Sequence, residues 1–173
     1  RIDIDNLKDI ATRKDGVVCA KLGADEYVVS VCDVYDDDDH QMLVVAESGQ
    51  GIRFPFVDIR PTSRSAGFVR AIKLKDKDKV IGAISVFEDD DCVISTDKGY
   101  AKRMHISNMT LQSRAGSGMR AMKLQPSRGK VNAISLALGE STAFVSDVGA
   151  VSVSTVSIPL QDREGSGVKV KGL

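Results

Sequence analysis

The chain has 173 residues, of which 42% are apolar and 5% aromatic, with no Trp. This apolar share excludes wholesale disorder, and the scarcity of aromatic residues points to a core of Val, Ile, Ala and Leu, a composition that favours β-strands. The 24 Lys and Arg balance the 24 Asp and Glu, so net charge alone does not indicate a nucleic-acid binder, although a basic stripe can coexist with a neutral total.

The first strands are expected after a weakly patterned beginning. Residues 6–12 are the only stretch that suggests a helical turn, and residues 16–22 resemble part of a later strand. Strands are then predicted at 42–46, 52–56, 69–74 and 80–86. The first two are joined by a tight turn at Ser48 and Gly49, where glycine supplies the positive φ that such turns need.

Two further groups of strands follow the same plan. The second group is predicted at 92–96, 100–104, 119–124 and 131–136, and the third at 143–146, 150–154 and 168–170. Apolar and basic residues alternate in 119–124, which is the period of two expected of a half-buried strand.

These groups are copies of one repeat of about fifty residues. Residues 49–53 align with 99–103, and residues 69–74 with 119–124. In the third copy, residues 160–168 align with 111–119. A fixed period of this length means that one supersecondary unit is used repeatedly, and such a unit needs neighbours because it cannot bury both of its faces alone.

We therefore predict an all-β fold of four-stranded antiparallel blades arranged around an axis, as in a propeller. The expected units are a partial blade at 1–35, full blades at 36–87 and 88–137, and a last blade, complete or partial, at 138–173. About three and a half copies are too few for most closed rings. The chain begins at Arg1 in mid-repeat, so we expect it to be a fragment of something longer.

The sequence offers no enzymatic or metal site. The acidic runs 36–39 and 88–91 lack the spacing and the glycine of an EF-hand-like calcium loop. Cys19, Cys32 and Cys92 contain no CxxC pair for zinc, and no phosphate-binding P-loop or nucleophile–His–acid set is present. No apolar run approaches the ~20 residues of a membrane span. We expect no catalysis by this chain on its own.

Two loops and one hairpin carry a family resemblance. Residues 112–118 (Gln-Ser-Arg-Ala-Gly-Ser-Gly) and 161–167 (Gln-Asp-Arg-Glu-Gly-Ser-Gly) resemble a box Q-R-R-G-G-K-G, and residues 95–103 resemble a T-x-x-G-Y-x-K-R hairpin. In these features the chain resembles the C-terminal domain of the A subunit of bacterial type IIA topoisomerases, which are DNA gyrase and topoisomerase IV. The resemblance runs from about residue 11 to the end. It implies a β-pinwheel, a propeller-like ring whose blades exchange strands with their neighbours.

The boxes depart from the family pattern. Both keep the Gln, the third-place Arg and two glycines, but Ser113 and Asp162 replace the Arg at the second place, and Ser117 and Ser166 replace the Lys. The first copy, at 62–68, keeps only its Arg. Degenerate boxes are typical of topoisomerase IV-like subunits, whereas the flanking sequence reads closer to gyrase, so both remain alternatives.

The resemblance also implies a DNA-binding rim. In this family DNA bends around the outer edge of the ring, and phosphate contacts offset the cost of bending. The DNA-binding residues predicted on this basis are Arg64, Arg70, Lys73, Lys102, Arg103, Gln112, Arg114, Gly116, Gly118, Arg120, Lys123, Arg163 and Lys169. For a recurring Arg, including Arg53, the alternative is a structural role in which the guanidinium bonds carbonyls of a neighbouring blade.

The implied function is to bind and bend or wrap DNA within an ATP-dependent type II topoisomerase, presenting DNA segments for strand passage. A gyrase-like domain would support negative supercoiling. A topoisomerase IV-like domain would guide relaxation and decatenation with weak wrapping. The implied partners are double-stranded DNA, the rest of the A subunit and the ATPase B subunit, in a heterotetramer of the bacterial cytoplasm and nucleoid, with no membrane.

No cofactor is expected in this domain, since ATP and Mg²⁺ would belong to other domains of the parent enzyme. A protein-interaction or chromatin-binding propeller is the alternative of another class. The Trp-Asp dipeptide of WD repeats is absent, because the chain has no Trp. The Gln-x-Arg-x-Gly-x-Gly loops argue against a chromatin-bound propeller.

Overall fold

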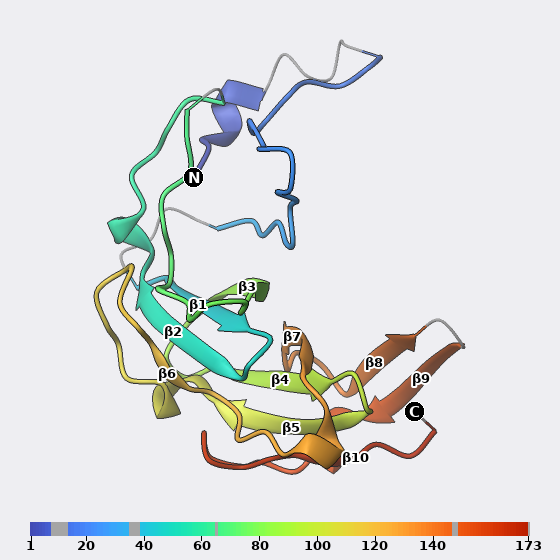
Figure 1. Ribbon diagram of the computed structural model, residues 1–173. Coiled ribbons are helices and arrows are strands. Elements are labelled where there is room, and N and C mark those ends of the chain that lie inside the picture. Colours follow the sequence, from blue (N-terminus) through green and yellow to red (C-terminus); the bar gives the residue numbers. More distant parts are fainter. Residues whose placement is uncertain (8–13, 35–38, 65, 147–148, 173) are drawn as a thin grey trace.

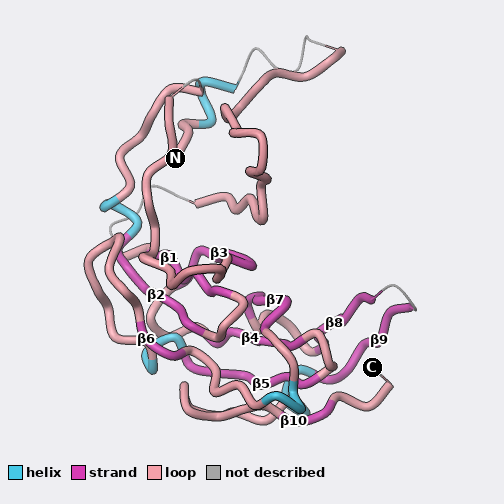
Figure 2. Tube along the Cα trace, viewed as in Figure 1, coloured by secondary structure: helices cyan, strands magenta, loops and turns pink. Residues whose placement is uncertain are grey.

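The computed structural model describes residues 1–7, 14–34, 39–64, 66–146 and 149–172. Within these ranges the chain forms antiparallel β-structure joined by loops and single 3-10 turns, without an α-helix (Figures 1 and 2). Two four-stranded sheets and a hairpin follow one another along an arc in Figure 1. The predicted all-β class with four-stranded antiparallel blades is confirmed.

The first sheet is built around a hairpin. It consists of β1 (Gln41–Ala46), β2 (Gln50–Pro55), β3 (Val80–Val86) and β6 (Met119–Arg120), in the order β3-β1-β2-β6. Gly49 in the β1–β2 turn has φ 80°, a conformation that glycine adopts without a Cβ clash. The second strand ends one residue earlier than predicted, because Phe56 opens the 3-10 turn η2 (Phe56–Asp58).

The second sheet repeats this arrangement. It consists of β4 (Asp91–Thr96), β5 (Tyr100–His105), β7 (Val131–Leu136) and β10 (Val168–Lys169), in the order β10-β5-β4-β7. The β1–β3 and β4–β7 pairs share a shift of register, which falls between Val45 and Ala46 in β1 and between Ser95 and Thr96 in β4. A 3-10 turn, η3 (Ile106–Asn108), again follows the second strand of the hairpin.

The third copy contributes a two-stranded sheet. β8 (Ser141–Ser146) pairs with β9 (Gly149–Ser154), and η5 (Thr155–Ser157) follows in the place of η2 and η3. The remaining 3-10 turn, η4 (Pro126–Arg128), precedes β7. No helix of the described residues has the length and apolar character needed to cross a bilayer.

The outer strand of each four-stranded sheet comes from the next copy of the repeat. β6 lies in the second copy but pairs with β2, and β10 lies in the third copy but pairs with β5. Figure 1 shows the segment between β5 and β6 leaving its own sheet and running beside the first one. This exchange confirms the pinwheel arrangement that the family resemblance implied.

A glycine permits the exchange where the strands cross. Gly118 has φ +69°, and a Cβ built there would lie 2.3 Å from the carbonyl oxygen of Gly51 in β2. Gly167 repeats this in the next copy, with φ +74° and the carbonyl oxygen of Ala101 at 2.9 Å. A side chain at either position would push the incoming strand away from the sheet.

The strands predicted at 69–74 and 119–124 are corrected by the structure. Residues 69–74 form no strand, and the second prediction shrinks to the two residues of β6. Likewise, 168–170 is reduced to β10. The backbone in 71–73 bonds instead to the loop of the next copy, through Ala115 N–H to the Ala71 carbonyl and Lys73 N–H to the Gly116 carbonyl, both at 2.8 Å. Apolar and basic residues do alternate in these segments, but their backbone groups bond to a loop of the next copy instead of forming a long strand pairing.

The beginning of the chain contains no strand in its described part. Residues 4–7 form a 3-10 turn, whereas the prediction of a helical turn at 6–12 falls mostly outside the described residues. Residues 14–34 form only loops and turns. Cys32 and Val34 nevertheless pack against the first sheet, and the amide of Ala83 in β3 donates to Ser30 Oγ at 3.0 Å.

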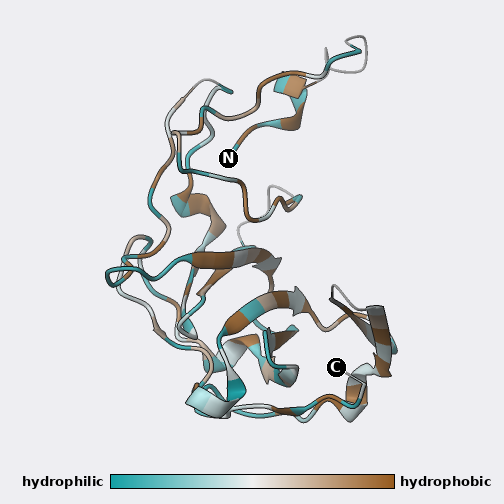
Figure 3. Ribbon diagram, turned by 45° about the vertical axis from the view of Figure 1, so that its right-hand side comes forward, coloured by the Kyte–Doolittle hydropathy of each residue, from teal (hydrophilic) through white to brown (hydrophobic). Residues whose placement is uncertain are grey.

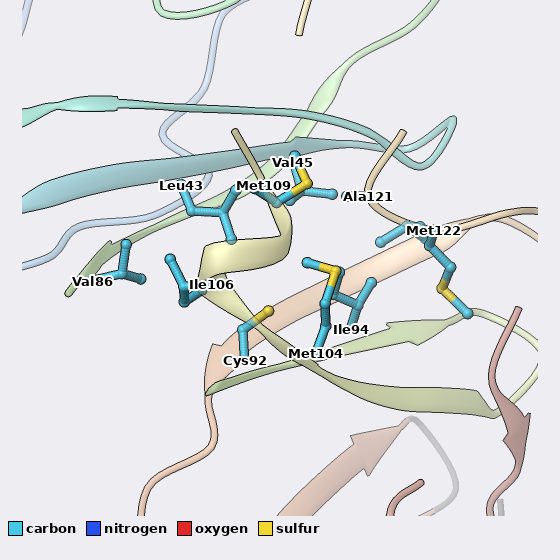
Figure 4. Close-up of a cluster of buried hydrophobic side chains, with 11 residues drawn as sticks. Leu43, Val45, Val86, Cys92, Ile94, Met104, Ile106, Met109, Ala121 and Met122 are labelled. Carbon is cyan, nitrogen blue, oxygen red and sulfur yellow. The ribbon is translucent and has the colours of Figure 1, made fainter. Parts of the chain in front are cut away.

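The main core lies between the two four-stranded sheets. Leu43 and Val45 of β1 pack with Cys92 and Ile94 of β4 and Met104 of β5, all fully buried (Figure 4). Their side chains point toward one another from the two sheets. Figure 3 shows hydrophobic colouring on strands of the sheets and also on loops of the N-terminal part. Each such side chain contributes about 1.5–3 kcal/mol by leaving water, so neighbouring blades stabilise each other.

Candidate nucleic-acid interface

The structure brings the basic segment of one copy against the box loop of the next. Besides the two backbone bonds that join 71–73 to this loop, Arg114 Nη1 donates to the Arg70 carbonyl at 2.6 Å. The side chains of Arg70 and Lys73 are exposed beside the loop. We call Arg70, Lys73 and residues 112–118 the first basic site.

The same arrangement recurs one copy later. Lys123 N–H donates to the Gly165 carbonyl at 3.2 Å, matching the bond between Lys73 and Gly116. Arg120 and Lys123 are exposed beside residues 161–167. We call this set the second basic site. Two successive blades therefore present an Arg–Lys pair in the same structural setting.

The glutamines and glycines of the box shape the loop itself. Gln161 Oε1 accepts the N–H of Gly167 at 2.9 Å and so closes the second loop. Gln112 is half-buried, and its backbone N–H donates to the carbonyl of Arg53 at 2.9 Å. Gly116 supplies its carbonyl to Lys73, and Gly118 allows the strand crossing. These residues thus hold the basic segments in place.

The box arginines differ from one another in their surroundings. Arg114 is half-buried, and its Nε donates to the carbonyl of Asp58 at 3.1 Å, so this residue ties two copies together. Arg163 instead pairs with Glu164 at 2.9 Å and keeps 44% of its side chain exposed. Arg64, in the first copy, is half-buried.

Lys102 is placed away from the surface, in contrast to its prediction as a DNA-binding residue. Its side chain is completely buried, and Nζ donates to the carbonyl of Asp162 at 2.6 Å. Burial lowers the pKa of the Lys102 ammonium to about 8, against opposing effects of Cys92, Asp162 and Glu164. A phosphate cannot reach a nitrogen enclosed in this way, so Lys102 does not belong to a DNA interface.

The hairpin arginines also have internal partners. Arg53 is buried, and its Nη1 donates to the carbonyls of Ile106 at 3.3 Å and Met109 at 2.9 Å, across the boundary between blades. Arg103, at the aligned position, keeps 23% of its side chain exposed and pairs with Asp91 at 3.4 Å. The contacts of Arg53 therefore match the structural alternative for a recurring arginine.

A further basic cluster surrounds Tyr100, and only Lys169 among its members was predicted from the sequence. Lys169 Nζ donates to the carbonyl of Lys98 at 2.7 Å and lies 5.8 Å from the centre of the Tyr100 ring. Arg128 lies over the same ring at 4.9 Å and donates to the carbonyls of Ser166, at 3.1 Å, and Gly167. In the first copy the corresponding segment reads Lys77-Asp78-Lys79, and its alternating charges did not single out the position of Arg128.

The described residues contain no group of three or more His, Cys, Asp or Glu placed to hold a metal ion. Burial raises the pKa of the Cys92 thiol to about 12, which keeps it a neutral member of the core. The two basic sites present positive side chains at the surface, and the chemistry of these side chains suits anions.

Exchanged four-stranded sheets with a glycine-rich basic loop at each crossing define a β-pinwheel domain. The family model described as "DNA gyrase C-terminal domain, beta-propeller" matches residues 40–86 and 90–137, more than half of the chain. The chain belongs to this family of DNA gyrase C-terminal domains. The first matched stretch contains β1, β2 and β3, and the second contains β4, β5, β6 and β7.

Individual relatives agree with this assignment. The chain is 27% identical over 161 residues to the A subunit of DNA gyrase from Chlamydia pneumoniae, covering 91% of this chain and 19% of that protein. It is 34% identical over 133 residues to the gyrase A subunit from Haloquadratum walsbyi, covering 76% of this chain and 15% of that protein. The chain therefore spans a fifth or less of these relatives.

Solved structures show the same fold. A DNA gyrase A C-terminal domain superposes with a TM-score of 0.83 at 25% identity, covering 94% of this chain and 56% of that one. The C-terminal domain of a DNA topoisomerase IV superposes with a TM-score of 0.70 at 19% identity, covering 78% of this chain and 43% of that one. At that lower identity the likeness concerns the fold alone.

Proposed function

We propose that this chain is a DNA-binding and DNA-bending domain of a type II topoisomerase A subunit, acting without catalysis of its own. The observation that carries the proposal is the repetition of the first and second basic sites on successive blades. Each site exposes an Arg and a Lys, and the backbone N–H of the Lys bonds to the next copy's loop. Repeated charges on a curved scaffold neutralise phosphates along a bent path without reading bases.

The gyrase-like version of this function, in which wrapping supports negative supercoiling, is our first choice because gyrase subunits are the named sequence relatives. The topoisomerase IV-like version is the second candidate. Its support is the loss of two basic residues from each box, where Ser113, Ser117, Asp162 and Ser166 now stand. Fewer charges in the loops would favour weaker wrapping.

The partners that go with this proposal are double-stranded DNA, the remainder of the A subunit and the ATPase B subunit, in the cytoplasm alongside the chromosome. We assign no cofactor to this domain and leave ATP and Mg²⁺ to other parts of the enzyme. The proposed DNA contacts are the basic residues Arg70, Lys73, Arg120, Lys123 and Arg163 of the two basic sites, together with Lys169 and Arg64, while Arg103 and Arg114 act mainly through their internal partners.

The test is DNA binding by this chain to a duplex of ~150 base pairs, titrated with salt and read out for bending. Strong binding that falls steeply with salt, accompanied by compaction of the duplex, would support the gyrase-like version. Binding without compaction would favour the topoisomerase IV-like version. No binding at low salt would overturn the DNA function and return the repeated Arg and Lys residues to a structural role.

A further inference from the structure

A carboxylate sits inside the second basic site. Glu164 Oε2 accepts from Nη1 of Arg120, and its Oε1 accepts from Nη1 of Arg163 at 2.9 Å. The N–H of Glu164 donates to Asp162 Oδ1 at 2.9 Å, and this local bond fixes the backbone from which the carboxylate reaches out. One acidic side chain thus pairs with an arginine from each of two copies.

The three side chains are accessible from solvent. Arg120 is 50% exposed, Arg163 44% and Glu164 42%. Ion pairs this exposed are weak and are weakened further by salt. An incoming anion can therefore compete with Glu164 for the two guanidinium groups.

In the first basic site no carboxylate pairs with the arginine side chains of described residues, although Asp58 Oδ2 accepts the backbone N–H of Arg114 at 3.4 Å. Ala115 stands at the position aligned with Glu164, and its backbone is in the left-handed region at φ 67°. Arg114 turns inward to the carbonyls of Asp58 and Arg70. The side chain of Arg70 makes no ion pair with a described residue and stays open to solvent. The two loops share a scaffold, but the second carries Asp162 and Glu164 where the first has Ser113 and Ala115, and of these two carboxylates Glu164 is the one that pairs with arginines.

We propose that Glu164 occupies the place of a DNA backbone phosphate and so weakens the second basic site. Two guanidinium groups converging on one pair of carboxylate oxygens is the geometry in which arginines bind a phosphate. DNA entering this site must first displace the carboxylate, which then remains nearby as a repelling charge. Contact with DNA is consequently graded along the chain, stronger at the first site than at the second. The inference rests on the proposed function.

The experiment compares Glu164→Gln with the unchanged chain in DNA binding across ~50–200 mM salt. The amide keeps the shape and removes the charge, so we expect affinity at low salt to rise about 3- to 10-fold. The slope of log affinity against log salt should steepen by about 1 to 2, because each regained phosphate contact releases about 0.9 counterion. Thermal unfolding establishes that the variant is folded, and Glu164→Ala serves as a second variant.

The matched control is Glu140→Gln. Glu140 is exposed and makes no ion pair with a described residue, so this change alters the net charge equally without freeing an arginine. We expect less than a 2-fold gain and an unchanged salt slope. In an Arg120→Ala background, Glu164→Gln should lose most of its effect. When each is made alone, the loss of DNA affinity caused by Arg120→Ala should be about 3-fold smaller than the loss caused by Arg70→Ala.

The outcomes separate the inference from the function on which it rests. If the unchanged chain binds DNA and Glu164→Gln binds no better than Glu140→Gln, the role of Glu164 is refuted and DNA binding stands. If Glu164→Gln binds and the unchanged chain does not, both are supported. If no variant binds at low salt, both are overturned.

Discussion

At the scale of single residues, identical side chains within one repeat have different tasks. Arg53 is buried against carbonyls of the next blade, whereas Arg70 is exposed beside the box loop. Both recur with the repeat, so periodicity alone predicts the same role for them. What distinguishes them is whether the guanidinium finds its acceptors inside the protein or faces solvent.

This contrast predicts opposite effects of two alanine variants. Arg53→Ala removes the guanidinium that bonds the carbonyls of Ile106 and Met109, and the buried Met109 carbonyl loses this donor, so we expect the free energy of unfolding to fall by about 2–4 kcal/mol. Arg70→Ala should change it by less than ~0.5 kcal/mol and weaken DNA binding. Urea unfolding and DNA titration of both variants check this. A stable Arg53→Ala protein with impaired DNA binding would reverse the assignment.

Lys102 predicts a pH dependence of stability. Its folded-state pKa of about 8 lies below the ordinary 10.5. Below about pH 8, the ammonium is charged in both states. Between about pH 8 and 10.5, the unfolded chain retains the proton that the folded chain releases, so the free energy of unfolding rises with pH.

The comparison is with Lys102→Met, which has no such proton. Ile52 occupies the aligned position in the first sheet and is buried, so an apolar side chain is suited to this site. Between about pH 8 and pH 10, the free energy of unfolding of the unchanged chain should rise by ~1–2 kcal/mol relative to that of Lys102→Met. Cys92 has a raised pKa that acts in the opposite direction and depends in part on the charge of Lys102, so both proteins are compared in a Cys92→Ala background. Parallel stability curves would mean that the ammonium is hydrated in the folded state.

At the scale of elements, strand exchange depends on close backbone approach. Gly118→Ala would put a Cβ 2.3 Å from the Gly51 carbonyl oxygen at φ +69°, so the β2–β6 pairing must open. Gly139 has a similar φ of +78° with nothing within 4 Å of a built Cβ. We expect Gly139→Ala to cost about 1 kcal/mol, from backbone strain alone, and Gly118→Ala at least ~3 kcal/mol.

Urea unfolding of the two alanine variants measures this difference, and hydrogen exchange at Met119 and Arg120 reports the pairing directly. Equal losses of stability would show that the crossing tolerates a methyl group. Gly118 is one of the residues predicted from the box for DNA contact, and its surroundings give it a structural task at the crossing.

At the scale of the whole molecule, bending needs more than one point of attachment. Lys73 and Lys123 are exposed at aligned positions on successive blades. Removing either one should lower affinity on every DNA sequence equally and reduce the salt slope by about 1. Lys73→Ala together with Lys123→Ala should abolish compaction of a ~150-base-pair duplex while leaving residual binding, because the contacts that offset bending are lost at both blades. Compaction that survives in the double variant would assign bending to other residues.

Much of the architecture was predictable because it is local. The hairpins at 42–56 and 92–104 are specified by short apolar runs and a glycine turn, and the strand at 80–86 was predicted at its observed bounds. The strands predicted at 69–74 and 119–124 were wrong in length or absent. The backbone partners of these residues lie about fifty residues away in another copy, so the local sequence does not specify them. The candidate site was found through its repeat, which located Arg70, Lys73, Arg120 and Lys123 but also selected the buried Lys102.

The sequence by itself determined the repeat, the all-β class and the family, because period, turn glycines and box motifs are written in the order of residues. Only the tertiary structure decided which basic side chains are available to a ligand. Burial encloses Lys102, inter-blade carbonyls hold Arg53, and Glu164 neutralises arginines from two copies. Such pairings depend on which loops meet across blades, and that proximity arises when the sheets pack and exchange strands.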